Sequence, residues 1–172
     1  WCGGATPRRE PVSPTQCGWI SIRAVDAARC RAVRLGASGQ TGSFVGEKIG
    51  FIGVGRMGSN MVSRLIAAGH VLTIYDPVAS AAAPAAAMGA RVAGSVADAA
   101  ALCTVVLASV PGPADARETA RLIADSTKLE VFIDLSTSGP AAAQAIALLL
   151  APRGLAAIDA PVSGGVKGAA AG

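Results

Sequence analysis

The sequence has few aromatic side chains, one histidine and no paired cysteine motif. Aromatic residues make up 3% of the 172 positions, so a folded core must be built from Ala, Val, Leu and Ile. None of the four cysteines forms a C-x-x-C pair, and His70 is the single histidine, so no metal site is predicted. We expect His70 to lie at the end of a helix and Cys103, inside an apolar run, to be buried.

The sequence also lacks long apolar runs and basic clusters interleaved with aromatic residues. No run of apolar residues reaches the length of about 18 that a membrane-spanning helix needs, so no membrane span is predicted. The net charge is +4, of which residues 1–47 carry +3. Because the remaining chain is nearly neutral and shows no basic patch with aromatics, no nucleic-acid partner is predicted.

Residues 1–47 differ in composition from the rest of the chain. They hold six arginines and three scattered prolines, show no sustained periodicity and begin with Trp instead of Met. We expect this extension to be disordered and assign it no function. Its Arg-rich, acid-poor composition resembles a mitochondrial transit peptide, and translated upstream sequence is the other interpretation. We expect a cytoplasmic protein, with the mitochondrial matrix as the alternative if 1–47 is a transit peptide.

From Lys48 onward, strand-like and helix-like segments alternate. Strands are predicted at 48–53, 71–75, near 91–93, 103–109, 131–134 and 155–159. Helices are predicted at 56–68, 79–88, 95–101, 113–125 and 139–151. This alternation predicts an α/β domain over 48–172, a Rossmann-type, doubly wound parallel sheet with helices on both faces. Because Pro84 lacks an N–H, we expect the second helix to start near it or to kink there.

A glycine triplet, Gly53-x-Gly55-x-x-Gly58, joins the first strand to the first helix. In this context the pattern is typical of dinucleotide binding. Gly53 allows the tight turn, Gly55 lets the backbone approach a pyrophosphate, and Gly58 lets the helix pack close to the strand. The phosphates would lie at the helix N-terminus, where free N–H groups favour negative charge. The alternative is a flexible turn between two ordinary elements.

Asp76 ends the second strand, 18 residues after Gly58. This spacing is close to the value of about 20 expected for the carboxylate that binds the adenosine ribose hydroxyls. A carboxylate there repels a 2′-phosphate, so NAD is favoured over NADP. Two alternatives stay open: Asp76-Pro77 can be only a turn, and a nearby Arg can restore NADP binding.

Polar or glycine-rich segments also follow the later strands. Ser136 and Thr137 supply hydroxyls that can cap the next helix, with Pro140 in its first turn. The turn Ser163–Gly165 offers consecutive N–H groups and one hydroxyl, which suit a small carboxylate, although an ordinary glycine turn is equally compatible. Asp159 is expected to shape that turn, and Lys167 is interpreted as an exposed loop residue.

Four stretches together carry a resemblance to a known family. They are GVGRMGSNM with its continuation at 53–70, Val110-Pro111, DLSTSGP at 134–140 and DAPVSGGVKGA at 159–169. The chain resembles the β-hydroxyacid dehydrogenase family, which includes 3-hydroxyisobutyrate dehydrogenase. The resemblance implies an N-terminal NAD(P)-binding domain of an oxidoreductase that acts on small 3-hydroxycarboxylates.

The resemblance also implies roles for individual residues. The expected cofactor-binding residues are Gly53, Val54, Gly55, Arg56, Met57, Gly58, Asp76, Val110, Pro111 and Thr137. The expected substrate-binding residues are Ser163, Gly164 and Gly165, which would hold the substrate carboxylate. The family's catalytic Lys lies in a Gly-x-x-x-Lys-x-x-x-Asn motif that would fall beyond Gly172. We therefore predict no catalytic residue and negligible turnover for this chain, as a C-terminally truncated member. The complete enzyme is expected to form homo-oligomers through a following helical domain.

Two other functions are compatible with the same sequence. One is a stand-alone dinucleotide-binding or sensor module without catalysis. The other is the NADP-dependent phosphogluconate dehydrogenase branch of the relatives, which the carboxylate of Asp76 argues against.

Overall fold

The computed structural model describes residues 23–24 and 48–171. The strands are β1 (Arg23–Ala24), β2 (Lys48–Ile52), β3 (Val71–Tyr75), β4 (Arg91–Val92), β5 (Val105–Ala108), β6 (Val131–Asp134) and β7 (Ala156–Asp159). The helices are α2 (Gly58–Ala67), α3 (Ala79–Ala87), α4 (Val96–Ala100), α5 (Pro113–Ile123), α6 (Pro140–Leu150) and α7 (Gly165–Ala171), and a 3₁₀ turn, η1 (Ala151–Arg153), follows α6.

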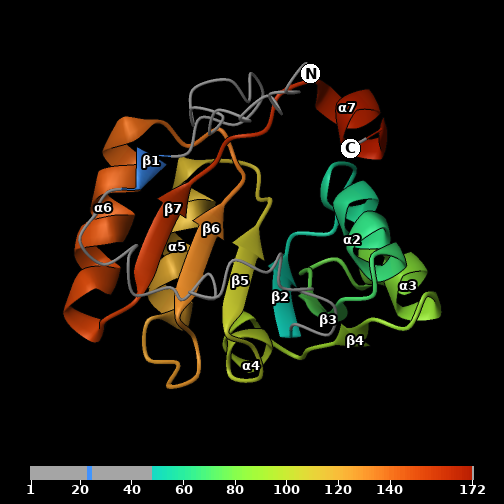
Figure 1. The fold of residues 1–172 in the computed structure, drawn as a ribbon, viewed down its shortest axis with the longest axis horizontal. Helices are drawn as coiled ribbons and strands as arrows, with labels where there is room; N and C mark the ends of the chain where they lie inside the picture. Colours follow the sequence, from blue (N-terminus) through green and yellow to red (C-terminus); the bar gives the residue numbers. More distant parts are fainter. Residues whose placement is uncertain (1–22, 25–47, 172) are drawn as a thin grey trace, which may run out of the picture.

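The strands form one sheet in the order β1-β7-β6-β5-β2-β3-β4, and every pair except β1 with β7 is parallel (Figure 1). From β2 in the middle of the sheet, the chain continues through β3 to β4 at one edge. It then returns to β5 on the other side of β2 and continues through β6 to β7. This is the doubly wound Rossmann order, so the predicted fold class is confirmed. The winding direction reverses between β2 and β5, and their carboxyl ends flank a crevice.

The predicted strands and helices of 48–159 are all present, with boundaries within two residues of those expected. Three described elements were not predicted: β1, the 3₁₀ turn η1 and α7. Helix α7 follows the glycine turn, so Lys167 is helical and the loop interpretation is wrong, although its side chain is exposed. Arg23–Ala24 pair antiparallel with β7. The expectation of disorder for the remainder of residues 1–47 lies outside the described residues.

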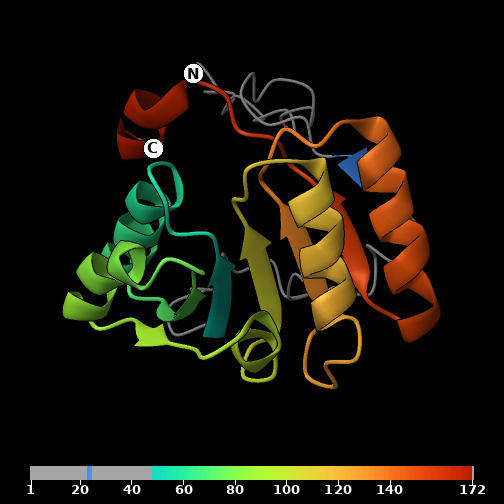
Figure 2. The same ribbon diagram turned by 180° about the vertical axis from the view of Figure 1, so that it is seen from behind.

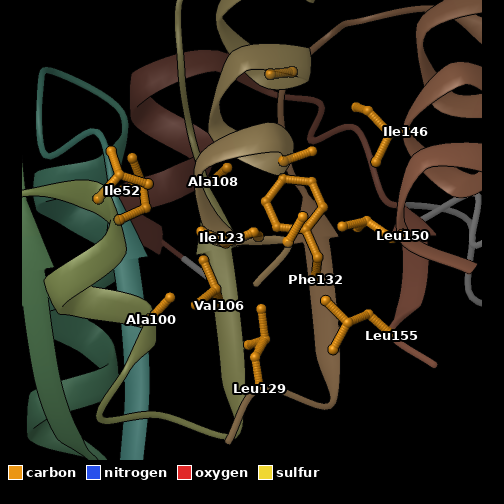
Figure 3. Packing of buried hydrophobic residues seen from close by; sticks show 14 of the residues in the cluster. Ile52, Ala100, Val106, Ala108, Ile123, Leu129, Phe132, Ile146, Leu150 and Leu155 are labelled. Atoms are coloured by element: carbon orange, nitrogen blue, oxygen red, sulfur yellow. The ribbon is translucent and has the colours of Figure 1, made fainter. Parts of the chain in front are cut away.

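Alternate side chains of the strands enter two separate cores. Phe51 belongs to the cluster under α2 and α3, whereas its neighbour Ile52 belongs to the cluster under α4, α5 and α6. Figure 2 shows the second group of helices from behind. In Figure 3, Phe132 of β6 packs between Ile123 of α5 and Leu150 of α6. Helices α2 and α3 therefore cover one face of the sheet, and α4, α5 and α6 cover the other. The parallel pairing of β2 to β7 places their carboxyl ends at one edge of the sheet.

Cys103 and His70 lie as predicted. Cys103 is fully buried, and burial raises the pKa of its thiol while a hydrogen bond with Thr73 lowers it in part. The thiol is therefore a small apolar group at neutral pH. His70 directly follows the end of α2, where its backbone N–H donates to the carbonyl of Leu65 at 3.1 Å. The helix-terminal position predicted for His70 is confirmed.

Pro84 lies inside α3, on its exposed side. The helix begins at Ala79, so it does not start near Pro84, and the kink expected as the alternative stays a prediction. The missing N–H frees the carbonyl of Ser80, and because Ser80 is also exposed, water can satisfy that carbonyl.

We expect Pro84→Ala to raise the free energy of unfolding by about 1–2 kcal/mol. The gain is the restored helical hydrogen bond, reduced by the greater freedom of the unfolded chain. Urea unfolding monitored by circular dichroism measures it. A stability equal to or below that of the unmodified chain would mean that α3 contributes little to the folded state.

Candidate dinucleotide-binding site

A cleft of about 670 Å³ opens at the carboxyl ends of β2, β3 and β5. Its walls come from the glycine loop, the turn after β3, the loop after β5 and one face of α5. The predicted cofactor residues that line it are Gly53, Gly55, Arg56, Met57, Gly58, Asp76, Val110 and Pro111. The fold therefore brings eight of the ten predicted cofactor positions to one cavity. Their assignment to a cofactor stays a prediction.

Two glycines of the loop are required by the packing of the loop itself. Gly53 has φ +87°, its N–H donates to the Tyr75 carbonyl at 2.9 Å, and an added Cβ would overlap the Ser109 carbonyl. A Cβ on Gly58 would overlap the Gly53 carbonyl oxygen. The first turn of α2 therefore lies directly against the end of β2, as the spacing of the triplet predicts.

Gly55 has the opposite environment, because nothing lies within 4 Å of a Cβ built there. The adjacent N-terminus of α2 has no side-chain cap and no acidic residue in its first turn. Its N–H groups and helix dipole are thus not neutralised by the protein's own carboxylates. The open space beside Gly55 and this positive helix end fit a pyrophosphate group.

Asp76 connects the glycine loop to the turn after β3. Its Oδ2 accepts a hydrogen bond from the Val54 N–H at 2.9 Å, and its Oδ1 accepts one from the Val78 N–H at 2.9 Å. A carboxylate oxygen has two lone pairs, so both oxygens can still accept from ribose hydroxyls. Val54 itself does not line the cleft: its side chain is buried and its N–H already donates to Asp76.

Ser136 and Thr137 do not cap α6. The residue before α6 is Gly139, and no side chain caps the helix, although Pro140 occupies the first turn as expected. The capping prediction is therefore wrong. The Oγ of Ser136 instead accepts a hydrogen bond from the Val110 N–H at 3.0 Å, across to the loop after β5. Thr137 is exposed and lies outside the walls of the cleft.

One of the three predicted substrate residues, Ser163, lies at a second cavity of about 390 Å³ between α2, α7 and the sheet. Ser163 lines it, beside apolar side chains that include Phe51 and Leu135. Gly164 and Gly165 have φ values of +93° and +60°, which make the turn that leads into α7. Ser163 is not among the walls of the larger cleft, and Gly164 and Gly165 line neither cavity.

Sequence reasoning missed the contribution of α5 to the cleft. Asp115, Glu118, Thr119 and Leu122 all line it. Their spacing of three, four and seven residues is the signature of one helical face, so the periodicity of 113–125 could have indicated them. Two hydrogen bonds from Arg121, at 2.8 and 2.6 Å, hold the pKa of Glu118 below its usual range.

The charge and polarity of the cleft follow from these side chains. Three carboxylates line it, from Asp76, Asp115 and Glu118, together with the guanidinium of Arg56, and the salt bridge with Arg121 compensates the charge of Glu118. Val78 and Leu122 add partly exposed apolar surface.

Within 23–24 and 48–171 no three His, Cys, Asp or Glu side chains gather closely enough to hold a metal ion. No helix in this part of the chain is long and apolar enough to cross a membrane.

A family model described as the NAD binding domain of 6-phosphogluconate dehydrogenase matches residues 48–172. Among curated proteins, a probable 3-hydroxyisobutyrate dehydrogenase of Mycobacterium bovis is 41% identical over 124 residues, which cover 72% of this chain and 42% of that protein. An NAD-dependent L-serine dehydrogenase of Pseudomonas aeruginosa is 38% identical over 130 residues, covering 73% and 44%.

A solved structure of Mycobacterium tuberculosis 3-hydroxyisobutyrate dehydrogenase with L-serine is similar to this fold. It superposes with a TM-score of 0.71 at 38% sequence identity, over 74% of this chain and 44% of that one. The chain thus spans less than half the length of the relatives that it matches.

Proposed function

The chain belongs to the family of the NAD-binding domain of 6-phosphogluconate dehydrogenase, as found in 3-hydroxyisobutyrate dehydrogenase-like enzymes, and we propose that it forms the cofactor site of an NAD-dependent 3-hydroxyacid dehydrogenase. The observation that carries this proposal is the cleft itself. It combines an open glycine, an uncapped helix N-terminus and a carboxylate at the end of β3.

Each part of the cleft suits one part of the cofactor. The pyrophosphate would lie beside Gly55 and Arg56 at the N-terminus of α2. The adenosine ribose would donate its hydroxyls to Asp76, and the apolar surface of Val78 would contact the adenine ring. The nicotinamide would then extend toward Val110 and the loop after β6. When bound, the nicotinamide ring supplies the hydride acceptor of the reaction.

The charges of the cleft favour NAD over NADP. A 2′-phosphate on the ribose would lie near the carboxylate of Asp76, and the carboxylate of Asp115 lines the same cavity. We therefore expect NADH to bind at least about tenfold more tightly than NADPH. Calorimetric titration of both cofactors under identical salt conditions measures the ratio. Tighter binding of NADPH would favour the phosphogluconate dehydrogenase branch instead.

The proposed substrate is a small carboxylate with a hydroxyl on the third carbon. Two relatives carry names that refer to 3-hydroxyisobutyrate and to L-serine, which share this arrangement. We propose that the consecutive N–H groups of the Ser163–Gly165 turn hold the substrate carboxylate. Residues 48–171 are assigned binding only, and the proton transfer is assigned to the Lys motif that the family resemblance implies.

Asp76→Ala is expected to weaken NADH binding by about 30-fold, because it removes a charged hydrogen-bond acceptor for the ribose. The substitution also releases the Val54 and Val78 N–H groups, which loosens the glycine loop. NADH fluorescence titration of the 172-residue chain measures the change.

Asp125→Ala is the matched control, because it removes the same charge from an exposed residue that pairs with Arg153 away from the cleft. It is expected to bind NADH like the unmodified chain. The proposed function is refuted if the folded, unmodified chain shows no saturable NADH binding.

A further inference from the structure

We propose that Ser136 is a positioning residue that sets the cleft wall for the nicotinamide half of the cofactor. The inference rests on the proposed function and deepens it. Its basis is a chain of two hydrogen bonds that joins the loops after β5 and β6. The Ser136 Oγ accepts from the Val110 N–H at 3.0 Å, and the Ser136 N–H donates to Asp134 Oδ1 at 2.9 Å.

The link lies just beyond the point where the hydrogen bonds between β5 and β6 end. Strands β5 and β6 pair in register up to Ala108 and Asp134, and the Leu135 N–H donates to the Ala108 carbonyl at 2.8 Å. The ladder between the strands ends there. Val110 lies two residues further on, where no strand carbonyl of β6 continues the ladder, and the Ser136 hydroxyl provides its acceptor.

The two side chains that make the link are buried. Ser136 is 6% exposed and Asp134 is 3% exposed, so water does not compete readily for either hydrogen bond. The carboxylate of Asp134 orients Ser136 by accepting from its backbone N–H. The hydroxyl of Ser136 in turn orients the peptide of Val110 by accepting from its N–H. Because Val110 and Pro111 line the cleft, the orientation of the Val110 peptide determines the position of this wall of the cleft.

The adenosine half of the cleft has a separate set of contacts. There, Asp76 holds the Val54 and Val78 N–H groups, and neither contact passes through Ser136. A change at Ser136 should therefore affect ligands that reach Val110 and spare ligands that stop at the second ribose. NADH is of the first kind, and ADP-ribose, which lacks nicotinamide, is of the second.

The test compares NADH and ADP-ribose binding by calorimetry in the 172-residue chain. Ser136→Ala is expected to weaken NADH binding about tenfold and to leave ADP-ribose binding within about twofold. Ser136→Thr, which keeps the hydroxyl, is expected to restore most of the NADH affinity. Equal weakening of both ligands, or no weakening of either, would overturn the inference.

Ser138→Ala is the matched control in the same loop. Its Oγ is buried and has no hydrogen-bond partner among the described residues, so its removal should change the binding of neither ligand. If the unmodified chain binds neither NADH nor ADP-ribose, the proposed function fails instead of the role of Ser136.

Amide hydrogen exchange tests the link without relying on a folded variant. In the unmodified chain the Val110 N–H is expected to exchange at least about a hundredfold more slowly than an unprotected loop amide. Exchange of Val110 at the rate of an unprotected amide would show that the Ser136 hydrogen bond is not maintained in solution, and the inference would fall.

Discussion

Gly58→Ala is expected to lower the free energy of unfolding by at least about 3 kcal/mol. The Cβ of alanine would overlap the carbonyl oxygen of Gly53, and it would also press on the ring of Phe51. Both the carbonyl and the Cα of residue 58 belong to backbone, so no side-chain rotation relieves the overlap, and α2 must move away from β2. A domain of this size has a total stability of only about 5–15 kcal/mol, so much of it would be lost.

Thermal unfolding measures this prediction as a fall in Tm on the order of 10 °C. Gly94→Ala is the matched control, because a Cβ there approaches the Asp98 carboxylate no closer than 3.4 Å, an ordinary contact. If Gly58→Ala melts at the temperature of Gly94→Ala, the close approach of α2 to the end of β2 is absent in solution.

The fold could be predicted from the sequence because its signals are local. The apolar run Ile49–Ile52 is buried on both faces of the sheet, and the alternation of such runs with helical segments specifies parallel βαβ units. The glycine triplet is equally local: the turn, the close approach and the helix start all lie within six residues. Local chemistry therefore determined the elements and the position of the cleft.

Other features depend on contacts between distant residues and could not be predicted. The hydrogen bond from Val110 to Ser136 spans 26 positions, and that from Val54 to Asp76 spans 22. Ser136, two residues after a strand, is interpreted from the sequence as a helix cap. The sequence does not indicate that the loop after β5 will lie beside it. The sequence likewise predicted Asp76 as a ribose ligand, but it did not predict the hydrogen bond by which Asp76 holds the glycine loop.

Helix α7 was missed for a different physical reason. Its sequence, GVKGAAA, contains two glycines and little alternation between apolar and polar residues, so neither propensity nor periodicity indicates a helix. Its neighbour α2 contributes to holding it in place: the Arg64 guanidinium donates to the Ala170 carbonyl at 3.1 Å. A tertiary contact therefore contributes to the C-terminal end of the helix.

Gly55→Ala is expected to weaken NADH binding by about 100-fold or more while leaving the fold intact. The backbone of Gly55 does not have a positive φ, and a Cβ there meets no protein atom within 4 Å, so alanine fits the folded chain without strain. Its methyl group would instead occupy the space beside the N-terminus of α2. A pyrophosphate could then no longer approach the N–H groups of that turn.

This combination separates binding from folding within one motif of six residues. Gly58→Ala should lose stability, whereas Gly55→Ala should keep the Tm of the unmodified chain or raise it slightly, because alanine reduces the freedom of the unfolded chain by about 0.4–1 kcal/mol. NADH titration and thermal unfolding of the same Gly55→Ala sample measure both effects. Unchanged NADH affinity would place the phosphates elsewhere, since only a ligand seated against Gly55 can sense a methyl group that touches no part of the protein.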